Sequence, residues 1–205
     1  MADTPTHREQ QKAETKQMIY TAGIKLFSER GYSRTTVSSI ARGARIAPRT
    51  FFTYYASKKD ILFEVPRHYC DQLIVQLTTK SAEQPTIEVF RAFLYSVTVT
   101  PPPEYYSNTD SQVYAIIFHS PDLQEYAGAI KQRLIDAFSY GFAQDMNCEI
   151  DDFAAKVSAE TVVNSFWSAG ATLLPYDRHF NDTSIDAYFA GLSAVFERLQ
   201  RQLSL

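Results

Sequence analysis

Apolar residues recur along this chain at spacings of three and four, and the pattern predicts helices throughout. Ile19, Ala22, Gly23, Leu26 and Phe27 fall at i, i+3, i+4, i+7 and i+8, which places them on one helical face. Apolar and polar residues do not alternate over six or more positions beside hairpin-type turns, so strands are not expected. The pattern therefore predicts an all-α protein.

Three of the predicted helices lie within the first 55 residues. The first covers about residues 8–30 and is followed by Gly31, a residue suited to a left-handed C-cap. The second begins at Thr35 or Thr36, either of which can cap its N-terminus. The third is short, covers residues 48–54, and opens with a proline in its first turn, where the missing N–H is not needed.

Longer amphipathic segments follow, which brings the total to about nine helices. Ser57 and Asp60 have the spacing of a capping box and open the fourth helix, in which Pro66 is expected to introduce a kink. The later helices are marked by Ile87–Val97, Val113–Ile117, Ser120–Met146, Asp151–Leu174 and a last segment that starts at Asp182 or Thr183.

Two short helices joined by a turn of three to four residues describe a helix-turn-helix, whose second helix lies in the major groove of DNA. Its aromatic residues Phe51, Phe52 and Tyr55 are expected to point inward. The outward side then carries candidate DNA contacts at Pro48, Arg49, Thr50, Thr53 and Tyr54. Arginine suits a guanine edge or a phosphate, while threonine and tyrosine suit phosphate oxygens or thymine methyl groups.

Two residues outside the third helix join these candidates. Lys58 lies in the first turn of the fourth helix, where positive charge is mildly unfavourable. A phosphate bound at that helix N-terminus would explain its presence. Thr36 offers a hydroxyl and neighbouring backbone N–H groups at the start of the second helix.

The charge is distributed unevenly. Residues 1–60 hold 11 Lys and Arg against 5 Asp and Glu, a net charge of +6, while residues 61–205 hold 9 against 18, a net charge of −9. A basic end on an acidic body indicates a polyanionic partner for that end alone. A chance fluctuation of surface charge is the alternative explanation.

The segment "IYTAGIKLFSERGYSRTTVSSIARGARIAPRTFFTYYASKKDIL" resembles the DNA-binding domain of TetR-like transcriptional repressors. The frame "A…LF…GY…TTV…IA" and the run "TFF.YY.SKKD" carry the resemblance, which covers about residues 12–65. The Pro-Arg-Thr-Phe-Phe version is similar to a subgroup common among actinobacterial regulators. The resemblance implies phosphate contacts by Thr36, Thr50, Tyr54 and Lys58, and a groove face formed by Pro48, Arg49 and Thr53.

Three residues depart from the family pattern. Arg45 stands in the turn where glycine is usual, and a positive φ is awkward for arginine. The turn therefore differs, or Arg45 adds a DNA contact. Ala47 replaces the small polar residue that usually caps the recognition helix, and Phe52 replaces a tyrosine, so it offers no hydroxyl to a phosphate.

The resemblance also divides the chain into a helix-turn-helix domain at residues 1–56 and an effector-binding and dimerisation domain at residues 57–205. Similar repressors dimerise through their last two helices as a four-helix bundle, here Asp151–Leu174 and Thr183–Leu203. The stretch "VVNSFWSAGATLL" is apolar on more than one face, which suits such an interface. An ordinary core helix is the alternative.

Aromatic residues are plentiful in the middle helices, where an effector pocket is expected. The candidates for its lining are Phe93, Tyr95, Tyr114, Phe118, Phe138 and Trp167. Each of them also suits the hydrophobic core. An apolar cavity with a few polar groups favours an uncharged aromatic or fatty effector.

Other functions find little support in the sequence. The four histidines form no local pair, and Cys70 and Cys148 lack metal-ligand spacing, so no catalytic site, metal or cofactor is predicted. No apolar run approaches the roughly 18 residues of a membrane span. The polar N-terminal residues do not resemble a signal peptide, which favours the cytoplasm.

We therefore predict a homodimeric, ligand-responsive repressor that binds a palindromic DNA operator. The alternative is a helical small-molecule-binding protein or enzyme whose basic N-terminal region is incidental.

Overall fold

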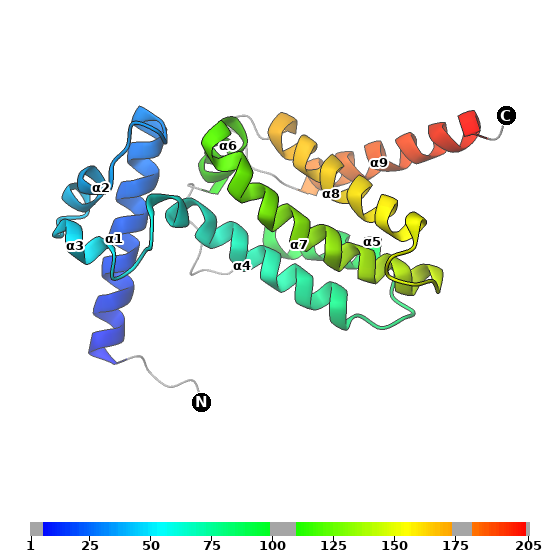
Figure 1. The fold of residues 1–205 in the computed structure, drawn as a ribbon, viewed down its shortest axis with the longest axis horizontal. Helices are drawn as coiled ribbons and strands as arrows, with labels where there is room; N and C mark the ends of the chain where they lie inside the picture. Colours follow the sequence, from blue (N-terminus) through cyan, green and yellow to red (C-terminus); the bar gives the residue numbers. More distant parts are fainter. Residues whose placement is uncertain (1–5, 99–109, 174–181, 204–205) are drawn as a thin grey trace. The chain divides into compact units, whose positions relative to one another are not determined.

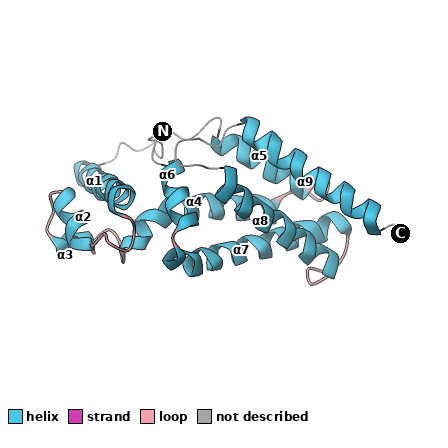
Figure 2. Cartoon of the chain, turned by 90° about the horizontal axis from the view of Figure 1, so that it is seen from above, coloured by secondary structure: helices cyan, strands magenta, loops and turns pink. Residues whose placement is uncertain are grey.

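The computed structural model describes residues 6–98, 110–173 and 182–203, and every regular element in these ranges is a helix (Figures 1 and 2). The chain divides into two compact units, Met1–Glu64 and Val65–Leu205. The helices are α1 (His7–Arg30), α2 (Val37–Gly43), α3 (Pro48–Phe51), α4 (Lys58–Thr79), α5 (Thr86–Thr98), α6 (Asp110–His119), α7 (Pro121–Met146), α8 (Phe153–Leu173) and α9 (Asp182–Leu203). The prediction of an all-α chain with about nine helices is confirmed for the described ranges.

The first unit packs α1, α2 and α3 around a small apolar core (Figure 1). Ile24 and Phe27 of α1, Ile40 of α2 and Phe51 of α3 are all buried in it. The chain leaves α1 at Gly31, whose φ of 80° lies in the left-handed region and whose N–H donates to the Phe27 carbonyl. Glycine tolerates this conformation without strain, so the predicted end of the first helix is confirmed.

Side-chain caps stabilise the N-termini of α2 and α4. Thr36, rather than Thr35, caps α2, because its Oγ1 accepts a hydrogen bond from the Ser39 N–H at 3.1 Å. At the start of α4, the Ser57 hydroxyl and N–H both donate to Asp60 Oδ2 at 2.8 Å. Such caps satisfy backbone groups that have no partner within the helix.

The second unit has an aromatic core. The ring of Phe90 on α5 lies edge-on to Phe138 of α7 at 5.1 Å, to Phe166 of α8 at 5.3 Å and to Phe189 of α9 at 5.8 Å, as measured between ring centroids. Edge-to-face pairs of this kind add to the free energy of apolar burial. One phenylalanine therefore connects four helices, with α7 and α8 lying side by side in both views (Figures 1 and 2).

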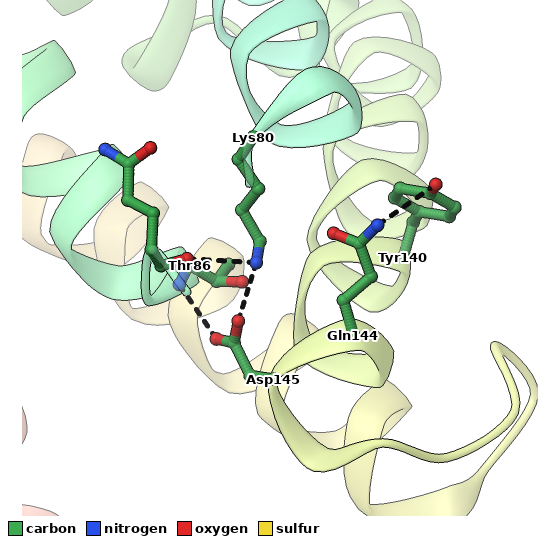
Figure 3. A network of polar contacts seen from close by, with 6 residues as sticks. Lys80, Thr86, Tyr140, Gln144 and Asp145 are labelled. Atoms are coloured by element: carbon green, nitrogen blue, oxygen red, sulfur yellow. Dashed lines mark hydrogen bonds and ion pairs between the residues drawn. The ribbon is translucent and has the colours of Figure 1, made fainter. Parts of the chain in front are cut away.

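A buried polar network joins the α4–α5 connection to α7 (Figure 3). The Lys80 side chain is fully buried, and its ammonium group lies 2.7 Å from Asp145 Oδ1 and 3.0 Å from the Gln84 carbonyl oxygen. Asp145 Oδ2 accepts the N–H of Thr86 at 2.8 Å. A side chain at Gly141 would place its Cβ 2.7 Å from Thr86 Oγ1, so glycine permits the close approach of α5 to α7.

We expect Asp145→Ala to lower the free energy of unfolding by about 2–3 kcal/mol, because it leaves the buried Lys80 ammonium without its counter-charge. Chemical denaturation measures this loss. Adding Lys80→Met to the alanine variant removes the uncompensated charge and should recover at least half of the loss. A double variant no more stable than Asp145→Ala would show that the ion pair is not the origin of the effect.

Candidate functional site

The turn between α2 and α3 closes through backbone hydrogen bonds. The Ile46 N–H donates to the Ala41 carbonyl at 2.9 Å, and the Arg45 N–H donates to the Arg42 carbonyl at 3.1 Å. This pair of bonds is the pattern of a Schellman motif, which needs a left-handed residue after the helix. Arg45 supplies it with a φ of 57°. The chain therefore keeps the turn geometry that glycine would favour, although an arginine occupies the position.

Helix α3 is only one turn long, and the chain continues through turns to Tyr54. Ala47 gives its N-terminus no side-chain hydrogen bond, as the sequence predicted. What holds the helix is burial, because Phe51 is 0% exposed and Tyr55, four residues later, is also buried.

Tyr55 is fixed further by a polar contact that sequence reasoning missed. Its hydroxyl donates to Glu64 Oε2 at 2.6 Å, and the other carboxylate oxygen of Glu64 pairs with Lys16 of α1. Burial raises the pKa of Tyr55 far above its ordinary value, and the hydrogen bond and negative charge of Glu64 raise it further. Tyr55 therefore remains a neutral donor at physiological pH and ties the end of the recognition segment to α1 and α4.

The predicted burial of Phe52 is wrong. Its side chain is 59% exposed, and its ring lies edge-on to Phe51 at 5.4 Å between centroids. In a helix, neighbouring residues are rotated by about 100°, whereas residues four apart share a face. Phe51 and Tyr55 take the inward face, so Phe52 turns outward.

The other predicted DNA contacts lie at accessible positions in the first unit. Thr36, Arg45, Pro48, Arg49 and Thr53 are exposed, while Thr50 and Tyr54 are half-buried. Arg49 lies in α3, and Thr53 lies in the turn that follows it. The segment 45–54 thus presents basic, hydroxyl and aromatic groups together.

Lys58 has an internal role that the sequence did not suggest. Its Nζ donates to the carbonyl oxygens of Tyr32 at 2.8 Å and Thr35 at 2.9 Å, and it lies 4.2 Å from the centre of the Tyr32 ring. These contacts anchor the start of α4 to the α1–α2 connection. They explain a lysine at a helix N-terminus without a phosphate, and the phosphate contact remains a prediction.

The residues predicted to line an effector pocket fall into separate groups. Phe93 and Phe138 are buried, and the Tyr95 hydroxyl donates to Asp186 of α9. Phe118 of α6 and Trp167 of α8 are half-buried and form an edge-to-face pair at 4.9 Å between centroids. The side chain of Tyr114 lies outside the described part of the structure.

The described residues contain no group of three or more His, Cys, Asp or Glu side chains that could hold a metal ion. Burial raises the pKa of the Cys70 thiol to about 12, so this cysteine is not a reactive thiolate near neutral pH. None of the helices in the described ranges is long and apolar enough to cross a membrane.

A short helix, a left-handed turn and a one-turn helix with an exposed basic face define a DNA-binding helix-turn-helix domain. Residues 19–65 match the family model described as "Bacterial regulatory proteins, tetR family". The helix-turn-helix of the first unit is therefore similar to the DNA-binding domain of that family. The actinobacterial subgroup stays a prediction.

Curated relatives agree with this assignment. A segment of 58 residues is 40% identical to the HTH-type transcriptional regulator HbdR of Aromatoleum sp. (strain CIB); it covers 28% of this chain but only 25% of HbdR. The transcriptional regulator MftR of Mycobacterium tuberculosis is 26% identical over 193 residues, which cover 91% of this chain and 89% of MftR. Similarity is therefore strongest in the DNA-binding domain.

Solved structures of other proteins share the fold of this chain over both units. NalD of Pseudomonas aeruginosa, described as the secondary repressor of the MexAB-OprM multidrug efflux pump, matches with a TM-score of 0.66 at 16% identity, over 90% of this chain and 96% of NalD. The TetR-family repressor FadR of Thermus thermophilus, solved with lauroyl-CoA, gives a TM-score of 0.52 at 18% identity, over 86% and 92%. The SmeT–triclosan complex gives 0.60 at 15% identity, over 86% and 90%.

Arg45→Gly is expected to raise the free energy of unfolding by about 0.5–1 kcal/mol. Glycine avoids a steric cost of about 1–2 kcal/mol, and the greater freedom of glycine in the unfolded chain offsets part of this gain. The shift in denaturation midpoint measures it. Arg45→Ala is the matched control: it removes the same charge but keeps the strain, so its stability should stay near that of the unaltered protein. Equal gains in both variants would assign the effect to the charge instead.

Proposed function

We propose that this protein is a ligand-responsive transcriptional repressor that binds a palindromic operator as a homodimer. The observation that carries the proposal is the helix-turn-helix, whose second helix exposes Pro48 and Arg49, with Thr53 exposed in the turn that follows, within the basic end of the chain. NalD and FadR, which share the fold, are described as repressors. The fold and the relatives favour a regulator over the alternative of an enzyme, and such a regulator acts in the cytoplasm, where its DNA lies.

In the proposed complex, the segment 48–54 enters the major groove and Arg49 meets a guanine edge or a phosphate. Thr50, Tyr54 and Lys58 are proposed to contact phosphates. The Thr36 oxygen already accepts the Ser39 N–H, but a hydroxyl also has a proton to donate, and this proton is available to a phosphate. Arg45, exposed beside the recognition helix, adds a second arginine to the same surface.

The exposed side of α9 supports the proposed homodimer. Its residues at i, i+3, i+4, i+7 and i+8 are all small or apolar and all exposed: Ala187, Ala190, Gly191, Ala194 and Val195. Small residues let two helix backbones approach closely. On the neighbouring helix α8, Phe153 is 81% exposed and Val157 is also exposed. Covering these faces with a second copy would remove apolar surface from water and would supply a second recognition helix for a two-fold symmetric operator.

The proposal assigns effector binding to the second unit. FadR and SmeT were solved with lauroyl-CoA and triclosan, respectively, and a small molecule with an apolar body is the proposed effector class here. An effector that binds the state unable to hold DNA more tightly than the DNA-bound state shifts the population toward release.

The test begins with DNA capture. Purified protein is incubated with fragmented genomic DNA from its source organism, and the retained fragments are sequenced. We expect enrichment of a palindrome with half-sites about 34–36 Å apart, or one helical turn, and an affinity that falls steeply with salt. No enriched sequence, or an affinity indifferent to salt, would contradict the proposal.

Arg49→Ala should then weaken binding to that operator by about 1–3 kcal/mol, as measured by fluorescence anisotropy with a labelled duplex. Arg49→Lys separates the two roles of the side chain. Lysine keeps a charge for a phosphate but lacks the fork that reads guanine. A lysine variant as weak as alanine indicates a guanine contact, a lysine variant with full affinity indicates a phosphate contact, and an alanine variant with full affinity excludes both.

Gly191→Leu is expected to shift the protein from dimer to monomer in sedimentation or light-scattering measurements. A Cβ built on Gly191 meets nothing within 4 Å in the single chain, so the larger side chain should leave the fold intact while it blocks a second copy. Gly191→Ala, which adds a single methyl group, should remain dimeric. A leucine variant that dimerises as tightly as the unaltered protein would place the interface elsewhere.

A further inference from the structure

We infer that Phe118, Lys131 and Trp167 form a binding site for an anionic effector, a carboxylate on an apolar body. The inference rests on the proposed function, because it assigns the effector site and the chemistry of its ligand within the second unit. The three side chains come from three helices, α6, α7 and α8.

The first observation is the aromatic pair. Phe118 and Trp167 lie edge to face at 4.9 Å with an angle of 79° between their planes, yet both are only half-buried. Elsewhere in the unit, aromatic contacts such as Phe90–Phe138 lie in the closed core. Part of the Phe118–Trp167 surface therefore faces away from the core and can cover the apolar part of a ligand.

The second observation is a cation without a counter-charge. The Lys131 ammonium lies 5.9 Å from the centre of the Trp167 ring. Among the residues that the structure describes, no carboxylate lies within ion-pair distance of it. Its own helix offers none either, because the positions three and four residues away hold Ala127, Gly128, Leu134 and Ile135.

The third observation is space beside this cation. Gly128 lies three residues before Lys131, on the same side of α7, and a Cβ built on it meets nothing within 4 Å. The absence of a side chain at Gly128 therefore leaves open space one helical turn before Lys131. In the proposed site, the ligand carboxylate approaches the ammonium group from this side.

Together, these features favour a ligand that has a negative charge as well as apolar surface. Lys131 is a half-buried residue whose ammonium group lies near the Trp167 ring. A carboxylate partner would form charge-assisted hydrogen bonds with that group, which an alcohol or ester cannot match. The tryptophan and phenylalanine rings supply area for the apolar body. This differs from the uncharged ligand that the aromatic composition alone suggested.

The chain contains one tryptophan, so its fluorescence reports on this site directly. Dodecanoate and 1-dodecanol, which share a chain length and differ in charge, are titrated into the full-length protein below their aggregation concentrations. We expect both to change the Trp167 emission, with dodecanoate binding at least about tenfold more tightly. Equal affinities, or no change in emission with either probe, would overturn the inference.

Three variants sharpen the test. Lys131→Met keeps a long unbranched side chain but removes the charge, and it should abolish the preference for dodecanoate. Lys12→Met removes a charge from an exposed position on α1 and should retain the preference. Gly128→Leu fills the open space and should weaken both probes. A Lys131→Met protein that still prefers dodecanoate by tenfold would contradict the assignment, provided its circular dichroism is unchanged.

The outcome is independent of DNA binding. A protein that captures an operator but does not distinguish the two probes retains the proposed function and loses this site. A protein that prefers dodecanoate but captures no operator retains the site and loses the proposed function.

Discussion

Burial of Phe51 is the contact on which the recognition surface depends. A helix as short as α3 has too few internal hydrogen bonds to persist on its own, and Ala47 gives it no side-chain cap. Phe51 and Tyr55 bring the segment into the core of the first unit, and Glu64 holds the Tyr55 hydroxyl. Arg49 and Thr53 are therefore exposed because Phe51 and Tyr55 occupy the core.

The helix caps and the glycine turn of this unit could be predicted because each depends on residues close together in the sequence. The cap at Thr36, the Ser57–Asp60 pair and the turn at Gly31 each depend on residues within a few positions. The inward orientation expected for Phe52 was wrong because aromatic character was given more weight than spacing. Phe51 and Tyr55, four positions apart, share the inward face, whereas Phe52 is rotated from Phe51 by about 100°. The partners of Lys58 were not predictable either, since its ammonium binds backbone carbonyls, a group that every residue offers.

In the second unit, the sequence identified the aromatic residues but not which of them lie in the core and which lie near the surface. Phe138 and Trp167 looked alike as candidates, but Phe138 is in the core beside Phe90 while Trp167 is half-buried beside Phe118. Only tertiary packing separates them. Lys131 was overlooked because a single lysine on a helix is unremarkable by composition. The absence of any acidic residue three or four positions away was a usable signal, since surface lysines often find a partner at that spacing.

Arg45 is a residue in a strained backbone conformation on the surface proposed to contact DNA. A left-handed arginine costs about 1–2 kcal/mol, a considerable part of the roughly 5–15 kcal/mol by which a domain is stable. The hydrogen bonds of the turn come from backbone groups of Arg45 and Ile46, so they make no demand on the arginine side chain. The left-handed conformation still favours glycine at position 45, so the fold tolerates the arginine side chain but does not require it. The core sets the orientation of the helix through Phe51 and Tyr55, so the side chain at position 45 can change the surface proposed to contact DNA while the helix stays in place.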